Sequence, residues 1–181
     1  MIFTNVSLLG NKNLLDCAEC TAGSYCEGIG NIKPTGPCGE GFYCPKGKKT
    51  KHPVGFECAP GYHCPEGSDA QVLCDSGTWT DLNQQATCKP CLEGYYCDRK
   101  DGPITEVTAH PCPIGFYCLN GTRFGSEFGC PKGTYGNRTK LKSPDECTSC
   151  PAGKYCEGKT TFHFLLRFSL SLVSIACAVK F

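Results

Sequence analysis

Apolar side chains are thinly spread over most of this chain, and they follow the cysteines rather than the period of a helix. One pattern recurs: Cys, two residues, Gly, one residue, an aromatic side chain and Cys. Each copy is a unit, named by the number of its first residue. Starting points 16 to 21 residues apart are the signature of a repeat architecture. Six short units begin at Cys20, Cys38, Cys58 (with His63 in the aromatic place), Cys91, Cys112 and Cys150, whereas two long units run from Cys74 to Cys88 and from Cys130 to Cys147.

This pattern predicts a small disulfide-rich fold: an elongated tandem array of short β-ribbon and turn modules with little regular secondary structure. The glycine in the fourth position of each unit, the repeat glycine, can supply a turn with positive φ at little cost. Stretches such as 41–44 and 115–118 are long enough for one rung of a two-stranded ribbon. No helical periodicity occurs before residue 162, and a helix is allowed only in the apolar tail that follows.

Composition divides the chain into four segments: an N-terminal segment 1–16, a first cysteine-rich block 17–97, a second block 98–158 and a tail 159–181. The first segment has no basic n-region, and Asn5, Gly10 and Lys12 interrupt its apolar run, so we do not expect a signal peptide. Cys17 stands where a long unit lying upstream would end, and the array breaks off after Cys156. We therefore expect a piece of a larger ectodomain.

The tail differs in kind from the rest, with 14 apolar residues among the 20 of 162–181. Its longest uncharged window, 168–179, has 12 residues, whereas a spanning helix needs about 20. The polar spacer of a lipid-anchor signal is missing. A marginal membrane segment and a non-native chain end are the alternatives, and the abrupt end of the array favours the second.

Hydrophobic burial alone does not account for a fold between residues 17 and 158. This stretch holds 17 Leu, Ile, Val and Phe among 142 residues, about 12 %, below the ~20 % that marks chains unable to bury a core. A formal charge of +1 argues against charge-driven disorder. The 18 cysteines remain as the stabilising element, and such usage is typical of an extracellular or cell-surface protein. Sequons at Asn5, Asn120 and Asn137 agree with that compartment.

Two pairing schemes fit the cysteines, because connectivity cannot be deduced from spacing alone. One of them, the second scheme, interlocks neighbouring short units, for example through Cys91–Cys112 and Cys97–Cys118, and leaves Cys150 and Cys156 without partners. Both schemes contain Cys74–Cys88 and Cys130–Cys147. The first scheme, which we favour, pairs cysteines within units and leaves only Cys17 and Cys177 over: Cys20–Cys26, Cys38–Cys44, Cys58–Cys64, Cys74–Cys88, Cys91–Cys97, Cys112–Cys118, Cys130–Cys147 and Cys150–Cys156.

No catalytic, cofactor or metal site is predicted. Phosphate loops, His-Glu-x-x-His and Gly-x-Ser-x-Gly are absent, and nearly every cysteine belongs to a repeat, so a free nucleophilic thiol is not expected. The Cys-x-x-Cys steps lie 71 and 59 residues apart, too dispersed for a zinc knuckle. Without a basic stripe, nucleic acid is not an expected partner. The densest positive cluster, 46–51, is interpreted as a solvated loop rather than a polyanion site.

The residues also carry a family resemblance. The stretch Cys130-Pro-Lys-Gly-Thr-Tyr-Gly, continued by Glu146-Cys147-Thr-Ser-Cys150-Pro-Ala-Gly-Lys-Tyr-Cys156, resembles the ephrin-receptor-like cysteine-rich repeat, and 74–97 resembles a second copy. More broadly, 17–158 is similar to growth-factor-receptor and tumour-necrosis-factor-receptor cysteine-rich modules. Three short units in a row, at 20, 38 and 58, depart from that pattern and put the pairing of the first block in doubt.

The resemblance implies an elongated extracellular module without enzymatic activity, used as a structural spacer or a protein–protein interaction surface. Its expected partners are other extracellular proteins or neighbouring repeats of a longer chain, and membrane contact through 162–181 stays open. One alternative is a fragment of a ligand-binding receptor ectodomain. Another is a protease inhibitor, which would need a rigid exposed loop such as 98–111.

Overall fold

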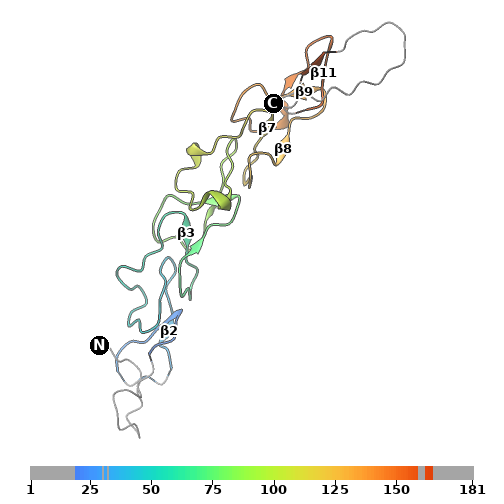
Figure 1. Ribbon diagram of the computed structural model, residues 1–181. Helices are drawn as coiled ribbons and strands as arrows, with labels where there is room; N and C mark the ends of the chain where they lie inside the picture. Colours follow the sequence, from blue (N-terminus) through green and yellow to red (C-terminus); the bar gives the residue numbers. More distant parts are fainter. Residues whose placement is uncertain (1–18, 30, 32, 159–161, 165–181) are drawn as a thin grey trace.

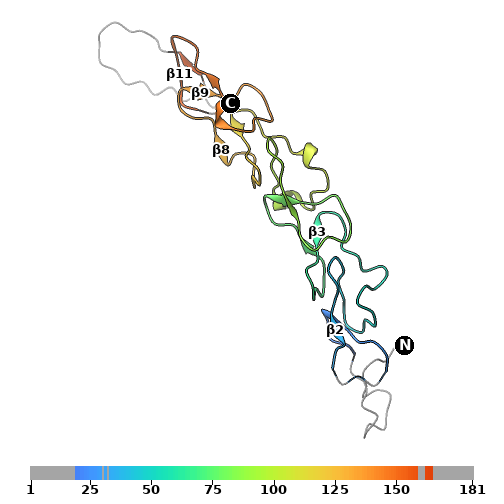
Figure 2. The same ribbon diagram turned by 180° about the vertical axis from the view of Figure 1, so that it is seen from behind.

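The eight units form a long, thin stack that runs in sequence order from one end to the other (Figure 1). The computed structural model describes residues 19–29, 31, 33–158 and 162–164. The view from behind shows the same narrow outline (Figure 2). In these ranges the chain has eight disulfides, twelve short strands, three 3₁₀ turns and no α-helix. The predicted fold class is confirmed.

The strands pair as six antiparallel two-stranded ribbons. In five of them, the strand that begins just after a repeat glycine pairs with the two residues before the next unit's first cysteine. Isolated bridges, Phe42 to Glu57 and Tyr95 to Pro111, repeat this pairing in the units at 38 and 91. The ribbons are β1 (Ser24–Tyr25) with β2 (Gly36–Pro37), β3 (Tyr62–His63) with β4 (Val72–Leu73), β5 (Thr78–Trp79) with β6 (Lys89–Pro90), β7 (Phe116–Tyr117) with β8 (Phe128–Gly129), β9 (Thr134–Tyr135) with β10 (Thr148–Ser149), and β11 (Lys154–Cys156) with β12 (Phe162–Phe164).

Main-chain hydrogen bonds at the repeat glycine join each unit to the next. Gly77 has φ 89°, its N–H donates to the carbonyl of Cys97 at 2.8 Å, and its carbonyl accepts from the N–H of Cys91 at 2.8 Å. The bond from the next unit's first cysteine to the glycine carbonyl forms at all seven junctions, with N–O distances between 2.8 and 3.0 Å. All eight repeat glycines have positive φ, which confirms the predicted turn.

A second pair of bonds closes most junctions on the other side. Between the units at 91 and 112, the N–H of Gly121 donates to the carbonyl of Cys91, and the N–H of Cys97 donates to the carbonyl of Thr122. The long units use Gln84 and Lys140 in the place of Gly121, at φ 58° and 65°. Four main-chain bonds therefore join the disulfide loop of the unit at 91 to the unit at 112.

Five of the eight repeat glycines also lie against the chain two units further on. A Cβ built on Gly23 would lie 2.5 Å from the carbonyl oxygen of Gly67, and one on Gly77 would lie 2.5 Å from that of Gly121. The same contact joins Gly61 to the side chain of Pro103. A side chain at these positions is excluded by the neighbouring backbone or ring as well as by φ.

Cystine fills most of the interior. Among the described residues, 18 hydrophobic side chains are buried, and 14 of them are cysteines. The other four form two small clusters. Trp79 packs with the Cys91–Cys97 pair, Ile104 and Val107, and Leu141 packs with Cys130 and Cys147. The expectation that cysteines replace a hydrophobic core is met in these units.

Three turns and the ends complete the description. The 3₁₀ turns are η2 (Arg99–Asp101), η3 (Val107–Ala109) and η4 (Pro144–Glu146). From the expected apolar tail, 162–164 forms strand β12, whereas the possible helix beyond it and the N-terminal segment lie outside the described residues. Nowhere in the described ranges does a helix have the length and hydropathy needed to cross a membrane. The boundary between the two blocks at 97 and 98 stays a prediction.

Candidate functional site

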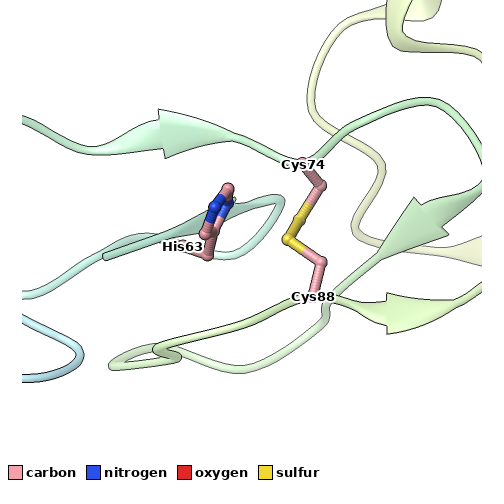
Figure 3. Close-up of side chains that lie close together, drawn as sticks. All are labelled: His63, Cys74 and Cys88. Carbon is pink, nitrogen blue, oxygen red and sulfur yellow. A yellow bond between two sulfur atoms is a disulfide. The ribbon is translucent and has the colours of Figure 1, made fainter. Parts of the chain in front are cut away.

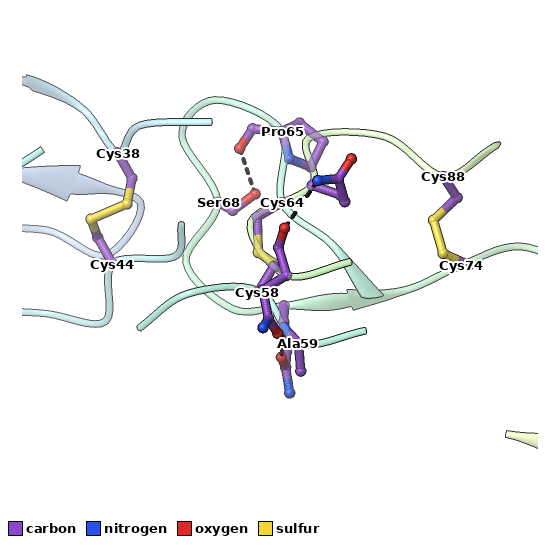
Figure 4. Close-up of a disulfide and its surroundings, with 12 residues drawn as sticks. Cys38, Cys44, Cys58, Ala59, Cys64, Pro65, Ser68, Cys74 and Cys88 are labelled. Carbon is purple, nitrogen blue, oxygen red and sulfur yellow. Dashed lines mark hydrogen bonds between the residues drawn. A yellow bond between two sulfur atoms is a disulfide. The ribbon is translucent and has the colours of Figure 1, made fainter. Parts of the chain in front are cut away.

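The structure contains the eight bridges of the within-unit scheme. Their Cα–Cα distances lie between 5.7 and 6.0 Å, within the usual range for disulfides. Figure 4 shows three of these bridges in succession along the stack, Cys38–Cys44, Cys58–Cys64 and Cys74–Cys88. The other five are Cys20–Cys26, Cys91–Cys97, Cys112–Cys118, Cys130–Cys147 and Cys150–Cys156. Cys17 and Cys177 lie outside the described residues.

The interlocking alternative does not occur in this structure. Cys118 is bonded to Cys112 rather than to Cys97, and Cys97 is bonded to Cys91. Neighbouring disulfide loops are joined by main-chain hydrogen bonds instead of by exchanged cysteines, so each short unit closes its own bridge. The first block, whose pairing was in doubt, follows the same rule: Cys26 is bonded to Cys20, and both side chains are fully buried.

The two long bridges each face an aromatic side chain from the unit before. Tyr117 packs against the cluster of Cys130, Leu141 and Cys147. His63 occupies the same position in its own unit and faces the Cys74–Cys88 bridge (Figure 3). A ring nitrogen of His63 and both sulfurs lie within 4.8 Å of one another. In this oxidised chain the sulfurs belong to a disulfide, so they are not the thiolates that zinc prefers.

A small cavity of about 250 Å³ opens beside His63. Its walls come from the units at 58 and 74, and Cys88 reaches it with a partly exposed side chain. The Nδ1 atom of His63 is buried and has no hydrogen-bond partner among the described residues. Asp75, also in the wall, accepts a hydrogen bond from Nη1 of Arg99 at 2.9 Å.

A larger open groove of about 510 Å³ lies where the units at 74, 91 and 112 meet. Asp98 caps η2 by accepting a hydrogen bond from the N–H of Lys100 at 3.0 Å, and Ser76 accepts one from the N–H of Arg99. Phe124 is 41 % exposed, so apolar surface borders the charged groups. The lining residues are Ser76, Asp98, Lys100, Arg123, Phe124 and Ser126.

Glu127 fixes the loop that presents Phe124. Its carboxylate accepts hydrogen bonds from Nη2 of Arg123 at 2.7 Å, from Nε at 3.0 Å and from the Arg123 N–H at 2.8 Å. Burial alone raises the pKa of Glu127, but the hydrogen bonds and the charge of Arg123 outweigh it and leave the pKa lowered. The pKa of Arg123 is raised in turn by the hydrogen bonds and charge of Glu127.

An exposed ion pair lies near Trp79. The hydrogen bond from Nζ of Lys89 to Asp81, 2.6 Å long, is the main cause of a lowered pKa at Asp81. The same Lys89 Nζ lies 4.4 Å from the Trp79 ring centroid and makes a cation–π contact with the indole. Trp79 itself is 8 % exposed.

The loop 98–111, considered above for protease inhibition, packs onto the stack. Ile104 is 5 % exposed and Val107 is 2 % exposed, and both contact the Trp79 cluster. Pro103 lies against Gly61, two units back. The loop therefore serves as the cover of a small core, and its apolar side chains are not available to a protease.

The other predicted surface positions are dispersed. Asn120 and Asn137 are exposed, as a glycan requires, and Asn5 lies outside the described residues. In the basic cluster 46–51, Nζ of Lys48 lies 3.2 Å from the Phe56 ring centroid, and Nζ of Lys51 lies 3.8 Å from Glu66. These two cations already have neighbours in the chain, in agreement with a surface-loop interpretation.

Sequence reasoning missed Thr80 and Leu141. Thr80 stands where a short unit has its second cysteine; it is 2 % exposed, and its carbonyl accepts the Gly61 N–H at 2.8 Å, as the cysteine carbonyl does elsewhere. The six-residue offset from Cys74 was the signal that could have found it. Leu141 is fully buried against the Cys130–Cys147 bridge, but an isolated Leu in a charged loop carries no such signal.

Comparisons with known proteins agree with the repeat. No family model matches the chain. It is 32 % identical over 101 residues, 56 % of its length, to a Toxoplasma gondii protein named cysteine repeat modular protein B. The chain spans about 1 % of that protein's length. The chain is an array of short cysteine-rich modules. Its many disulfides indicate an oxidising environment, secretory or extracellular.

Proposed function

We propose that the chain acts as a structural spacer in a secreted or cell-surface modular protein, carries a protein-interaction surface and has no catalytic role. The observation that carries the proposal is the repeated junction, in which main-chain bonds and the repeat glycine hold each unit to the next. Such a stack keeps its two ends apart and leaves most side chains on the surface, which is what a spacer requires.

The proposal is tested by removing one unit and measuring the length of the particle in solution. Deleting residues 38–57, the whole unit at 38, joins Pro37 to Cys58. Pro37 then precedes the first cysteine of a unit, as it does in the native chain, so the main-chain bonds of the junction can form between the units at 20 and 58. Small-angle X-ray scattering should show a folded rod shorter by about one unit of eight. Reduced and alkylated chain is the control for an expanded coil. An unchanged maximum dimension, or a compact particle before deletion, would contradict the spacer role.

The alternative role, a ligand-binding receptor ectodomain, is supported by the groove at the units at 74, 91 and 112. Lys100 offers a cation beside the exposed Phe124, while Arg123 is already paired with Glu127, so an extracellular protein with an acidic and apolar segment suits the groove. A pull-down from cell-surface extracts should capture a protein with the wild-type chain and lose it with Phe124→Ser. Leu82→Ser, at an exposed residue outside the groove lining, is the matched control. Capture unaffected by Phe124→Ser removes this role.

Membership of the ephrin-receptor-like class is part of the proposal and rests on sequence. The Cys-x-x-Gly-Thr-aromatic start and the Cys-x-x-Cys step of the long units support it. Both long units also have the same bridge and the same ribbon, β5 with β6 and β9 with β10. Protease inhibition, the third candidate, loses support because the loop 98–111 is packed onto the stack.

A further inference from the structure

The Cys74–Cys88 bridge differs from the other long bridge in its surroundings. Cys130 and Cys147 are 5 % and 9 % exposed, and the phenol-bearing Tyr117 packs against them. Cys74 is 4 % exposed, but Cys88 is partly exposed and lines the 250 Å³ cavity. An imidazole, rather than a phenol, faces this bridge (Figure 3). Cys88 is therefore the more accessible residue of this bridge, and Cys74 is the more shielded one.

The imidazole is what sets this bridge apart chemically. Among the described residues, only at Cys74 and Cys88 does a histidine nitrogen lie within 4.8 Å of both sulfurs of a bridge. Thiol–disulfide exchange is faster when the leaving sulfur is stabilised as a thiolate, and a neighbouring cation supplies that stabilisation. One ring nitrogen of His63 lies within 4.8 Å of both sulfurs, and Nδ1 makes no hydrogen bond within the described chain, so no other described group holds that nitrogen away from the bridge.

We propose that Cys74–Cys88 is a thiol-exchange site, opened by a small-molecule thiol that attacks Cys88 while His63 stabilises the departing Cys74 thiolate. The thiolate RS⁻ forms an S–S bond to Cys88, the Cys88–Cys74 bond breaks, and its electron pair leaves on Cys74. A second molecule of the same thiol attacks the mixed disulfide, giving RS–SR and the Cys88 thiolate. The two thiols are oxidised together and the bridge is reduced.

The charges around the cavity permit this chemistry. Asp75 lines it, and an unpaired carboxylate there would oppose a thiolate nearby. The guanidinium of Arg99 donates to Asp75 at 2.9 Å and offsets that charge. A neutral monothiol such as 2-mercaptoethanol meets the least electrostatic resistance and is the probe of choice.

A second partly exposed cysteine gives the test an internal reference. Cys150, in the short Cys150–Cys156 bridge, is also partly exposed, but none of the histidines whose side chains the structure describes, His52, His63 and His110, has a nitrogen within 4.8 Å of both of its sulfurs. Accessibility alone would open the two bridges at similar rates. The imidazole makes Cys74–Cys88 open first.

The experiment treats the full oxidised chain with limiting 2-mercaptoethanol, quenches it with acid, alkylates free thiols and quantifies each cysteine by peptide mass spectrometry. Cys74 and Cys88 should be labelled before Cys150 and Cys156, and His63→Tyr, which copies Tyr117, should slow their opening about tenfold. His63→Gln keeps a small polar side chain and should give the same slowing if His63→Tyr fails to fold. Rates at Cys150 should be unchanged in both variants.

Two results would overturn the proposal. The first is opening of Cys150–Cys156 as early as Cys74–Cys88 in the wild-type chain. The second is a His63→Gln variant whose Cys74–Cys88 opens as fast as before, relative to Cys150–Cys156. Emission from Trp79, the one tryptophan of the chain, gives an independent readout, because its strand β5 pairs with β6 directly after Cys88. Its spectrum should shift as the bridge opens.

Discussion

Glycine occurs in the repeat for two reasons, positive φ and close approach of a neighbouring backbone. Two glycines with the same local conformation, Gly77 and Gly133, allow these reasons to be tested separately. Gly77 and Gly133 both belong to long units, have φ of 89° and 81°, and make the same two junction hydrogen bonds. They differ in the described atoms that lie beside them. A Cβ on Gly77 would lie 2.5 Å from the carbonyl oxygen of Gly121, whereas a Cβ on Gly133 would have no described atom within 4 Å.

The magnitudes follow from these contacts. Gly133→Ala places an L side chain at positive φ, which costs about 1–2 kcal/mol. Gly77→Ala carries that cost and also forces the Gly121 backbone to move, and overpacking of this kind costs roughly a further 1–3 kcal/mol. The second variant should therefore weaken its junction ~5-fold to ~150-fold more than the first.

Native-state hydrogen exchange, with all bridges intact, measures this locally. The Cys91 N–H bonds to the Gly77 carbonyl at 2.8 Å, and the Cys150 N–H bonds to the Gly133 carbonyl at 2.9 Å, so each amide reports on its own glycine. The ratio of exchange rates between variant and wild type gives the change in opening free energy. Equal changes in opening free energy at the two sites would show that the close approach of Gly121 to Gly77 adds nothing to the cost of a side chain there. Positive φ would then be the whole reason for glycine at both positions.

Three further outcomes are expected. Leu141→Ala should lower the free energy of unfolding by about 2–5 kcal/mol, because the lost side chain is fully buried against a bridge; guanidinium unfolding followed by near-UV circular dichroism checks this, and a loss under ~0.5 kcal/mol contradicts it. The pKa of Glu127 is lowered on folding, so its contribution to stability is present above the unfolded value of ~4.3 and is lost as pH falls through the folded value; Glu127→Gln should remove this dependence from the Arg123 amide signal in an NMR titration. Reductant in excess should abolish ordered structure, and a reduced chain with native-like NMR dispersion is incompatible with a fold held by cystine.

The sequence predicted what is local to a unit. Turns at the repeat glycines and ribbons one rung long follow from residues a few positions apart, so spacing was enough to anticipate them. The contact between Gly77 and Gly121 joins residues 44 positions apart in the chain. The sequence around Gly77 does not predict which segment lies against it. For the same reason the sequence explained this glycine by φ alone.

The candidate sites were less predictable than the fold. The loop 98–111 is expected from the sequence to be exposed, yet its Ile104 and Val107 pack with Trp79; two apolar residues without periodicity do not indicate burial. The sequence shows His63 in the place of the aromatic residue, but its approach to Cys74 and Cys88 depends on the stacking of two units. The groove likewise draws its walls from three units, and only the three-dimensional stack brings them together.

The junction between units has a consequence for how such a protein changes over generations. Its hydrogen bonds run between main-chain atoms, and the side chains it demands are chiefly cysteine and glycine. A duplicated unit therefore finds its docking partners already in place, and the exposed residues between the cysteines can diverge more freely than buried ones such as Trp79 and Leu141. The array can lengthen by duplication while individual loops specialise. The two changes are independent because the junctions depend on main-chain atoms and the loop surfaces depend on side chains.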